Sequence, residues 1–569
     1  MEPSVALALE HLPADVRPLA DIARRALASS LDLRGLPLPR RSASIARPNE
    51  RRDAEARASL ADNLTTGLAP LSPPVAVLDA LRSLAQPGCW AVVTGQQPGL
   101  CAAPLLTLYK ALQAIALARE LAAAWDTPVV PIFWNHGDDH DLAEANRLFV
   151  ANENLDVEKL SLAGLSSGRQ PLSTIVVEPL AHGLSAMEDR LRAMLARAPG
   201  ANSQLALDLC LPRAGESLAR AMTRTLTSLL GHHGLVVVEP DWMREDLSRA
   251  LADLVSSGPG HSGPGLVAAA RGPGSALPAA LAAGSAALSE GGLDPSIDQG
   301  SAAILFRLED GRRRALRFGG DGYRFDDEPG SRTPAELAAE IIQEPAAYSA
   351  GALLRPLVQD AVLPTAATVG GWGELAYQAQ LGPARALAGL PPVPFIPRIS
   401  ITLTDPECRS SLEKAGLTAA EIIGGLDLST NNKEEAAPAA LALAEAADRL
   451  RVDLLSLRPA LAELDPSLVA GLKRAADQAR KSIQRLADKA ARVADNQSGA
   501  GRRHRRRLAA TLMPRGEPQE RLTGPLPWLS RFGTAWLDEL LAELDPCAPE
   551  HLLVHLSDDP AAGNDNPAP

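Results

Sequence analysis

The spacing of apolar residues changes along the chain and divides it into segments of different predicted structure. Continuous apolar runs at residues 90–93 and 128–134 are typical of buried strands. Between these runs, apolar residues recur at helical spacing: Leu105, Leu108, Leu112, Ile115 and Ala118. The pattern predicts a strand, a helix and a second strand, which together form a βαβ unit with a right-handed crossover and parallel strands.

Two later apolar runs predict further strands of the same sheet. GLVVVEP begins at Gly234, and TAATVGGWGE begins at Thr365. Parallel strands bring their carboxyl ends to one edge, where open α/β sheets bind ligands. We therefore expect the loops at residues 94–99 and 135–141 to face one crevice. Residues 256–300 are rich in Gly, Pro and Ala, and a hairpin turning at Asp310 and Gly311 follows, which indicates an inserted segment.

A different apolar period governs the last third of the chain. Leucines alternate at spacings of four and three, which predicts a helical seam: Leu450, Leu454, Leu457, Leu461, Leu464 and Leu468. Asp465 followed by Pro466 resembles a helix start, so the seam is predicted to consist of two long helices. Residues 557–569 have the composition of a disordered tail.

Charge and cysteine content narrow the function classes. The 569 residues carry a formal net charge of −12, so nucleic acid is not a predicted partner. The five cysteines form no CxxC pair, which suits free thiols in a reducing compartment. The sequence shows no export signal and no apolar run long enough to span a membrane. We expect a cytoplasmic protein that acts on small molecules.

The most distinctive polar cluster follows the second predicted strand. Asp138, Asp139 and Asp141 surround His140, an arrangement that suits general acid/base chemistry or Mg²⁺ binding. The alternative is a helix N-cap, with Asp139 or Asp141 accepting backbone N–H groups.

Two other groups could contribute to a site. The loop Thr94, Gly95, Gln96 and Gln97 could direct backbone N–H groups at an anion, although glycine turns after strands are common for steric reasons alone. Further polar residues are embedded in apolar sequence: Arg355, Gln359, Asp360, Glu374, Tyr377 and Arg398. The arginines suit carboxylate or phosphate binding; buried ion pairs of Arg355 with Asp360 and of Arg398 with Glu374 are the alternative.

Two remaining clusters are weaker candidates. His232 and His233 have no second ligand pair at metal spacing, so we predict an ordinary loop and no metal site. The basic run at residues 502–507 could bind a nucleotide phosphate, but such runs are usually solvated faces.

Several segments together resemble one known family. VVTGQQPGL with PLLTLYKALQAIALA, PVVPIFWNHGDDHDLAEAN, LLRPLVQDAVLPTAATVGGWGELAYQAQ and PQERLTGPLPWLSRFG resemble the cysteine ligase family of bacillithiol biosynthesis (BshC). The resemblance runs from about residue 85 to 555. It implies a carbon–nitrogen-bond-forming ligase that adds cysteine to glucosaminyl malate, the last step of bacillithiol synthesis, with ATP and Mg²⁺ as the expected activator. It also implies a homodimer.

The resemblance further implies an α/β fold with a Rossmann-like parallel-sheet core and inserted connecting segments, plus a C-terminal α-helical coiled-coil domain. We predict the catalytic body at residues 1–390, with insertions at about 150–230 and 256–345, and the helical domain at residues 391–556.

Residue by residue, the family's GQQ loop falls on Gly95, Gln96 and Gln97, and its acidic motif on Asp138, Asp139, His140 and Asp141. Its other two motifs fall on residues 355–360, and on Gly370, Gly371 and Glu374. Two positions depart from the family: Asp138 stands where Glu is usual, and Trp372 where Pro is common.

The residues also leave two other functions open. A metal-dependent hydrolase or nucleotidyl transferase could use the cluster of Asp138 to Asp141. A non-catalytic dimeric scaffold could instead use the C-terminal helices as its functional surface.

Overall fold

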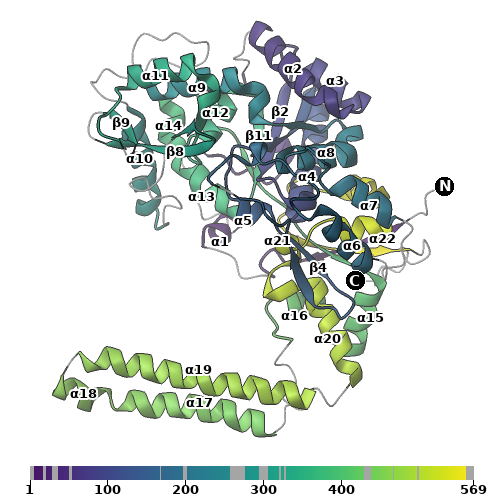
Figure 1. The fold of residues 1–569 in the computed structure, drawn as a ribbon, viewed down its shortest axis with the longest axis vertical. Helices are drawn as coiled ribbons and strands as arrows, with labels where there is room; N and C mark the ends of the chain where they lie inside the picture. Colours follow the sequence, from purple (N-terminus) through teal and green to yellow (C-terminus); the bar gives the residue numbers. More distant parts are fainter. Residues whose placement is uncertain are drawn as a thin grey trace. The chain divides into compact units, whose positions relative to one another are not determined.

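The structure is a computed structural model, and its described residues form two compact units. The described residues are 5–16, 21–27, 36–49, 54–166, 168–195, 202–256, 276–293, 305–319, 322–325, 328–428, 438–465, 467–495 and 499–558. Unit 1 comprises the described parts of residues 1–15, 19–403 and 519–569, and unit 2 those of residues 16–18 and 404–518. Each unit is described by itself (Figure 1).

A five-stranded parallel sheet forms the centre of unit 1 and confirms the predicted fold class. Its strands are, in order, β12 (Phe395–Pro397), β11 (Thr365–Gly370), β2 (Trp90–Gln96), β3 (Val129–Asn135) and β6 (Val236–Val238). From β2 the chain adds β3 and β6 on one side, and later β11 and β12 on the other. The strand order therefore reverses between β2 and β11, and such a switch point in an open α/β sheet is a ligand-binding position.

Helices cover both faces of this sheet (Figure 1), which explains why its strands are continuously apolar. Phe133 and Val237 pack in one core with residues of α4 and α8, whereas Ile132 and Trp134 pack in a second core with α3, α9 and α12. The helices of unit 1 are α1 (Asp21–Leu27), α2 (Ala54–Leu68), α3 (Val75–Leu84), α4 (Leu106–Trp125), α5 (Leu142–Ala145), α6 (Leu184–Leu195), α7 (Ser203–Cys210), α8 (Leu218–Leu230), α9 (Arg244–Ser256), α10 (Ala276–Glu290), α11 (Pro334–Gln343), α12 (Arg355–Val362), α13 (Trp372–Gln380), α14 (Gly382–Leu387), α21 (Gln519–Leu522), α22 (Leu526–Phe532) and α23 (Ala535–Glu543).

The chain adds two antiparallel sheets between elements of the central fold. One is the pair β4 (Leu148–Ala151) and β5 (Val157–Leu160). The other has the order β10 (Tyr348–Ala350), β7 (Leu305–Glu309), β8 (Arg312–Gly319) and β9 (Gly322–Phe325). Asp310 and Gly311 link β7 to β8 with φ angles of 50° and 72°, the left-handed conformation that a two-residue hairpin turn needs. The predicted hairpin is confirmed.

A third sheet brings the two ends of the described chain together. β14 (His551–Ser557) lies between β1 (Ala6–Leu12) and β13 (Ser400–Thr404), and Leu9 of β1 is paired with Val554 of β14. Residues 391–403 and 519–556 consequently lie in unit 1, whereas the sequence-based division assigned them to the helical domain. The difference arises because strand pairing places these residues in unit 1, and a heptad pattern carries no information about strand pairing. The predicted tail began at residue 557, but Ser557 is the last residue of β14 and is paired with Ala6; residues 559–569 lie outside the described residues.

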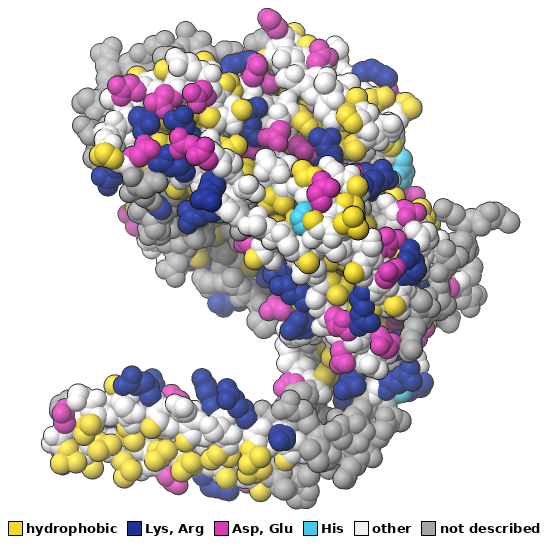
Figure 2. All heavy atoms as spheres, in the orientation of Figure 1, with side chains coloured by type: hydrophobic (Ala, Val, Ile, Leu, Met, Phe, Trp, Pro, Cys, Tyr) yellow, Lys and Arg dark blue, Asp and Glu magenta, His cyan; other side chains and the backbone are white. Residues whose placement is uncertain are grey.

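Unit 2 is helical. Its helices are α15 (Pro406–Ala415), α16 (Ala419–Ile423), α17 (Pro438–Ser456), α18 (Arg458–Leu464), α19 (Leu468–Asp495) and α20 (Gly499–Leu512). The predicted break near Asp465 is confirmed, although Pro466 itself is outside the described residues. α17 and α19 pack side by side, and Figure 2 shows apolar side chains gathered along them, with Val452 64% and Leu486 53% exposed.

The basic run lies on α20. No helix in the described part of the chain combines the length and apolar character needed to cross a bilayer.

Candidate active site

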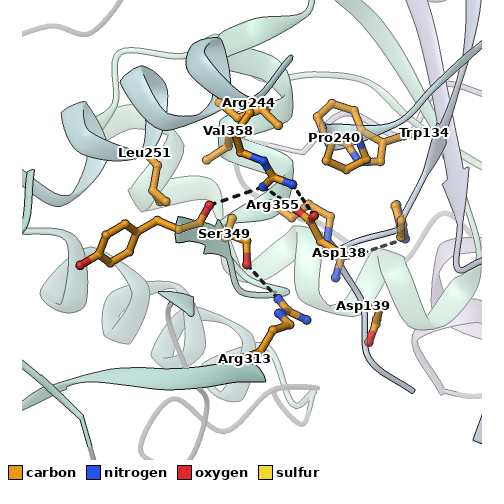
Figure 3. A pocket seen from close by; sticks show the side chains of 14 residues that line it. Trp134, Asp138, Asp139, Pro240, Arg244, Leu251, Arg313, Ser349, Arg355 and Val358 are labelled. Atoms are coloured by element: carbon orange, nitrogen blue, oxygen red, sulfur yellow. Dashed lines mark hydrogen bonds and ion pairs between the residues drawn. The ribbon is translucent and has the colours of Figure 1, made fainter. Parts of the chain in front are cut away.

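A hollow of about 510 Å³ lies beyond the carboxyl ends of β3 and β6. Its walls come from the loop after β3, from α9 and α12, and from β8 and β10 of the inserted sheet. Figure 3 shows that the charged side chains lining it come from all of these elements except β10: Asp138, Asp139, Arg244, Arg313 and Arg355. The inserted sheet therefore supplies one wall of a site whose floor is the Rossmann-like sheet.

Asp138 is held by an arginine that begins α9. Arg244 donates two hydrogen bonds to its carboxylate, from Nη2 to Oδ1 at 2.7 Å and from Nη1 to Oδ2 at 3.1 Å. Burial alone would raise the pKa of Asp138, but the charge and hydrogen bonds of Arg244 outweigh burial and lower it. Arg244 also contacts Asp241. Asp138 is therefore an ionised partner of Arg244 rather than a proton donor.

Arg313 of β8 extends from the inserted sheet into the hollow. Its guanidinium lies over the ring of Phe306, 4.0 Å from the centroid, and is 3.3 Å from Nδ1 of His140 and 3.4 Å from Oγ of Ser349. Arg313 is only 7% exposed, and its Nε has no hydrogen-bond partner among the described residues. Burial lowers the pKa of this guanidinium, which is held without full charge compensation.

Arg355, the first residue of α12, enters the hollow from another side. Its Nη1 lies 2.8 Å from Nδ1 of His136, and because a guanidinium can only donate, the imidazole nitrogen accepts. Burial, followed by the positive charges of Arg355 and Lys110, holds the pKa of His136 well below its ordinary value. Within the described residues, no carboxylate oxygen lies within 4.0 Å of the Arg313 or Arg355 guanidinium. The hollow thus holds two cations without a carboxylate of the described residues at ion-pair distance.

The rest of the acidic motif mainly organises its own loop. Oδ1 of Asp139 accepts the backbone N–H of His140 at 2.6 Å, and Oδ1 of Asp141 accepts that of Glu144 at 3.0 Å, which caps α5. The N-cap alternative is confirmed for Asp141. Burial and then Arg313 lower the pKa of His140, so its ring is neutral near neutral pH. In the described part of the chain, these carboxylates do not belong to a convergent group of metal-ligand atoms.

A buried lysine organises the switch point between β2 and β11. Lys110 of α4 is 1% exposed, and its Nζ donates to the carbonyl of Gly95 at 2.8 Å, to Oε1 of Gln96 at 3.0 Å, and to Glu374. Glu374 also accepts the N–H of Gly371 at 3.1 Å. Burial lowers the pKa of Lys110, and Glu374 opposes this shift. The lysine therefore joins the GQQ loop to the GG-x-GE segment.

Small residues at this position allow close approach of the strands. A Cβ on Gly95 would lie 2.6 Å from the carbonyl oxygen of Trp134 and 2.7 Å from Nε2 of His136. A Cβ on Gly370 would lie 2.7 Å from the ring of Phe395. Thr94 is structural, since its Oγ1 donates to the carbonyl of Val369 at 2.9 Å and ties β2 to β11.

Three predicted residues lie in other surroundings. Asp360 forms a buried ion pair with Arg385 at 2.5 Å, and Gln359 donates to Asp360 at 3.3 Å. Arg398 pairs with Glu520 at 2.9 Å. The alternative considered from the sequence, pairing of Arg355 with Asp360 and of Arg398 with Glu374, is therefore wrong.

Glu520 explains why Arg398 is held away from the hollow. This glutamate is fully buried and also accepts the Oγ–H of Ser400 and the N–H of Ile401, each at 2.9 Å. Tyr377 lies beside Glu374 at the switch point and forms a side-chain hydrogen bond with it; burial and then Glu374 raise the pKa of Tyr377.

A second, smaller hollow of about 320 Å³ lies against the GQQ loop. Gln96 and Gln97 contribute to its lining, together with the side chains of Glu144, Arg147 and Arg521. Arg147 lies 3.3 Å from Glu144, so the two arginines leave one net positive charge here. The loop thus borders this hollow, and its Lys110 contact connects it to the switch point.

Four site residues were not singled out from the sequence. Lys110 had a usable signal, because it is the one charge within the apolar stretch LTLYKALQAIALA. His136 lies next to a strand end and could have been included on that ground. Arg244 and Arg313 lie in the polar runs REDLSR and GRRRALRF, which resemble exposed surface.

Fold and site together define a Rossmann-like protein with an arginine-lined hollow at the carboxyl edge of its sheet. Residues 40–399 match the family model described as "Bacillithiol biosynthesis BshC, N-terminal Rossmann-like domain", and residues 401–556 match that for the BshC C-terminal coiled-coil domain. The chain therefore belongs to the BshC family of bacillithiol biosynthesis.

Curated relatives agree over most of the chain. A protein of Koribacter versatilis, named "Putative cysteine ligase BshC", is 30% identical over 82% of this chain and 84% of its own length. A protein of the same name from Solibacter usitatus is 30% identical over 80% of this chain and 82% of its own length. That of Geobacillus kaustophilus is 28% identical over 88% and 90%, respectively.

Proposed function

We propose that this protein is a ligase that joins the carboxyl group of cysteine to the amino group of glucosaminyl malate and so forms bacillithiol. The relatives' name supports the cysteine-ligase part of the proposal. The observation that carries it is the pair Arg313 and Arg355, which face one hollow without carboxylate partners among the described residues. Guanidinium groups that line a hollow favour an anionic ligand, and the malyl group supplies two carboxylates.

The neutral ring of His140, which contacts Arg313 of the same hollow, gives the site a proton acceptor. A sugar ammonium must lose a proton before its nitrogen can attack an acyl group. In the structure, Nδ1 of His140 is engaged by Arg313 at 3.3 Å, a long contact. When a substrate carboxylate binds Arg313, this contact is given up, and the neutral imidazole accepts the proton. Asp138 acts indirectly, by fixing Arg244 at the opposite wall.

ATP with Mg²⁺ is part of the proposal, because a free carboxylate does not form an amide without activation. The hollow beside Gln97 fits the negative phosphates, since it combines Arg147 and Arg521 with the loop that ends β2. ATP would supply the phosphoryl or adenylyl group that activates the cysteine carboxylate, with ADP or pyrophosphate as the respective leaving group. The residues of the two hollows bind and orient the reactants.

The alternative functions receive less support. A metal-dependent hydrolase needs the acidic motif to converge on an ion, whereas Asp138 is bound to Arg244 and Asp141 caps a helix. A non-catalytic scaffold gives no reason for two arginines that line one hollow without carboxylate partners among the described residues. We also propose a homodimer, which the exposed leucines and Val452 along α17 to α19 support. A cytoplasmic location stays a prediction.

The test is mass spectrometry of purified protein incubated with cysteine, glucosaminyl malate, ATP and Mg²⁺. We expect bacillithiol, and AMP or ADP beside it distinguishes an acyl-adenylate from an acyl-phosphate. Arg355→Gln should lower kcat/KM for glucosaminyl malate by about 10- to 100-fold, because a hydrogen bond to a charged group contributes roughly 1.5–3 kcal/mol. Arg249→Gln is the matched control, since Arg249 is 60% exposed on α9. No product from folded protein would refute the ligase proposal.

A further inference from the structure

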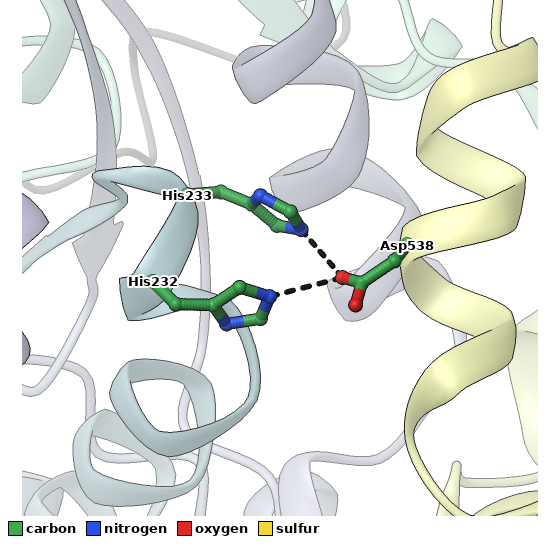
Figure 4. A group of neighbouring side chains, drawn as sticks. All are labelled: His232, His233 and Asp538. Atoms are coloured by element: carbon green, nitrogen blue, oxygen red, sulfur yellow. Dashed lines mark hydrogen bonds and ion pairs between the residues drawn. The ribbon is translucent and has the colours of Figure 1, made fainter.

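Two adjacent histidines and a distant aspartate meet on the surface of unit 1. His232 and His233 lie in a short 3-10 turn, Gly231–His233, and Asp538 lies on α23. Nε2 of His232 is 2.9 Å from Oδ1 of Asp538, and Nε2 of His233 is 2.6 Å from the same oxygen. Figure 4 shows both rings directed at this carboxylate from one side. The sequence separation of about 300 residues explains why the histidines had no visible third ligand.

We propose that His232, His233 and Asp538 form a binding site for a divalent transition-metal ion of the Zn²⁺ class. Among the described residues, they are the group whose His, Cys, Asp or Glu ligand atoms all lie within 4.8 Å of one another. Two imidazole nitrogens and one carboxylate oxygen are a donor set that Zn²⁺ and its neighbours in the first transition series accept. This site is separate from the proposed ligase chemistry.

The exposure of the group suits an ion that enters from solvent. The side chains of His232 and Asp538 are 49% and 54% exposed, and that of His233 is 14% exposed. Ligand atoms around a tetrahedral Zn²⁺ lie roughly 3.3 Å apart, given metal–ligand distances of about 2.0–2.1 Å. The present contacts of 2.6 and 2.9 Å therefore need to open only slightly, and water can occupy the fourth position.

In the absence of an ion, a contact with Arg119 determines the tautomer of His233. Its Nη2 lies 2.8 Å from Nδ1 of His233, and because the guanidinium donates, the neutral ring carries its own proton on Nε2. Metal binding through Nε2 requires the proton to move to Nδ1, so Arg119 must turn away. Arg119 is exposed on α4 and is free to do so. The arginine and the metal ion therefore compete for His233, and this competition can be measured.

An ion at this position would link α23, close to the end of the described chain, to the turn that precedes β6. Because the unfolded chain does not bring the three ligands together, the ion binds the folded state preferentially and stabilises it.

The test uses tag-free full-length protein, titrated with Zn²⁺ by calorimetry and with Co²⁺ by visible absorption. We expect one ion per chain and a higher melting temperature with Zn²⁺. His232→Gln and Asp538→Asn should each weaken binding at least about 10-fold, because even indirect partners of metal ligands contribute that much. Arg119→Gln should tighten binding. His11→Gln is the control, since His11 is exposed on β1 and outside the group.

Three outcomes would overturn the site. They are no saturable binding by the unsubstituted protein, equal binding after substitution of His232 or Asp538, and weaker binding after Arg119→Gln. Equal binding would place the ion elsewhere, for example at the partly exposed thiol of Cys547.

Discussion

Arg244 contacts two carboxylates of different exposure, which allows a matched test of the acidic motif. The side chains of Arg244 and Asp138 are 15% and 23% exposed, whereas that of Asp241 is 48% exposed. Removing one charge from a buried pair costs about 3–5 kcal/mol. Because Arg244 keeps Asp241 as a partner, we expect Asp138→Asn to lower the free energy of unfolding by about 3 kcal/mol, the lower end of that range. Asp241→Asn should cost only about 0–1 kcal/mol, as for an exposed pair.

The free energy of unfolding of both variants is measured by urea unfolding followed by tryptophan fluorescence. Trp134 lines the same hollow and is one of the reporting side chains. A loss of about 3 kcal/mol raises the unfolding equilibrium constant more than 100-fold. The pKa of Asp138 is below its ordinary value of 3.8 when folded. Its stabilisation is therefore fully present above that ordinary value and is lost as the pH falls through the folded pKa. The difference between the unsubstituted protein and Asp138→Asn should accordingly disappear in strong acid.

Two results would refute this reasoning. Equal destabilisation by the two substitutions would show that the different exposure of Asp138 and Asp241 does not determine how much each contributes to stability. Loss of activity in Asp138→Asn without loss of stability would assign Asp138 a direct role on the substrate, as the sequence alone suggested.

Three further predictions concern the hollow beyond β3 and β6 and the switch point between β2 and β11. Arg313→Gln removes a charge that lowers the pKa of His140, so the acid limb of the kcat/KM profile should move to higher pH; an unchanged limb would exclude His140 as the base. Lys110→Met leaves the Glu374 carboxylate without its cation and should lower the free energy of unfolding by roughly 3–5 kcal/mol, measured by urea unfolding. Gly95→Ala places a Cβ 2.7 Å from Nε2 of His136; the displacement should reduce turnover up to about 100-fold, and normal turnover would contradict the close packing.

The central sheet could be predicted from the sequence because its signal is local. Residues 128–134 are apolar without alternation, and β3 is buried on both faces by helices, so the pattern and the packing have the same cause. The hairpin at Asp310 and Gly311 and the break near Asp465 were predicted for the same reason, since turn and cap preferences depend on a few neighbouring residues. Pairing of β1 with β14 joins the two ends of the described chain, and no local pattern indicates it.

The candidate site was predictable only where it depends on strand ends. The GQQ and GG-x-GE segments follow neighbouring parallel strands, and Lys110 connects them as that topology allows. Arg313 reaches the hollow from an inserted sheet, so its position depends on how the insertion packs against the core. The third partner of His232 and His233 is equally remote in sequence, which is why these histidines were assigned no role.

The wrong ion pairs show how far geometry could have corrected the sequence reasoning. Arg355 and Asp360 are five residues apart on α12, and at about 100° per residue their side chains point roughly 140° apart around the helix. They cannot meet, and one face of α12 directs Arg355 to the hollow while another buries Asp360 with Arg385. The helix period therefore excludes the wrong partner and predicts two separate roles. It cannot supply the right partner, because Arg385 lies on the next helix but one.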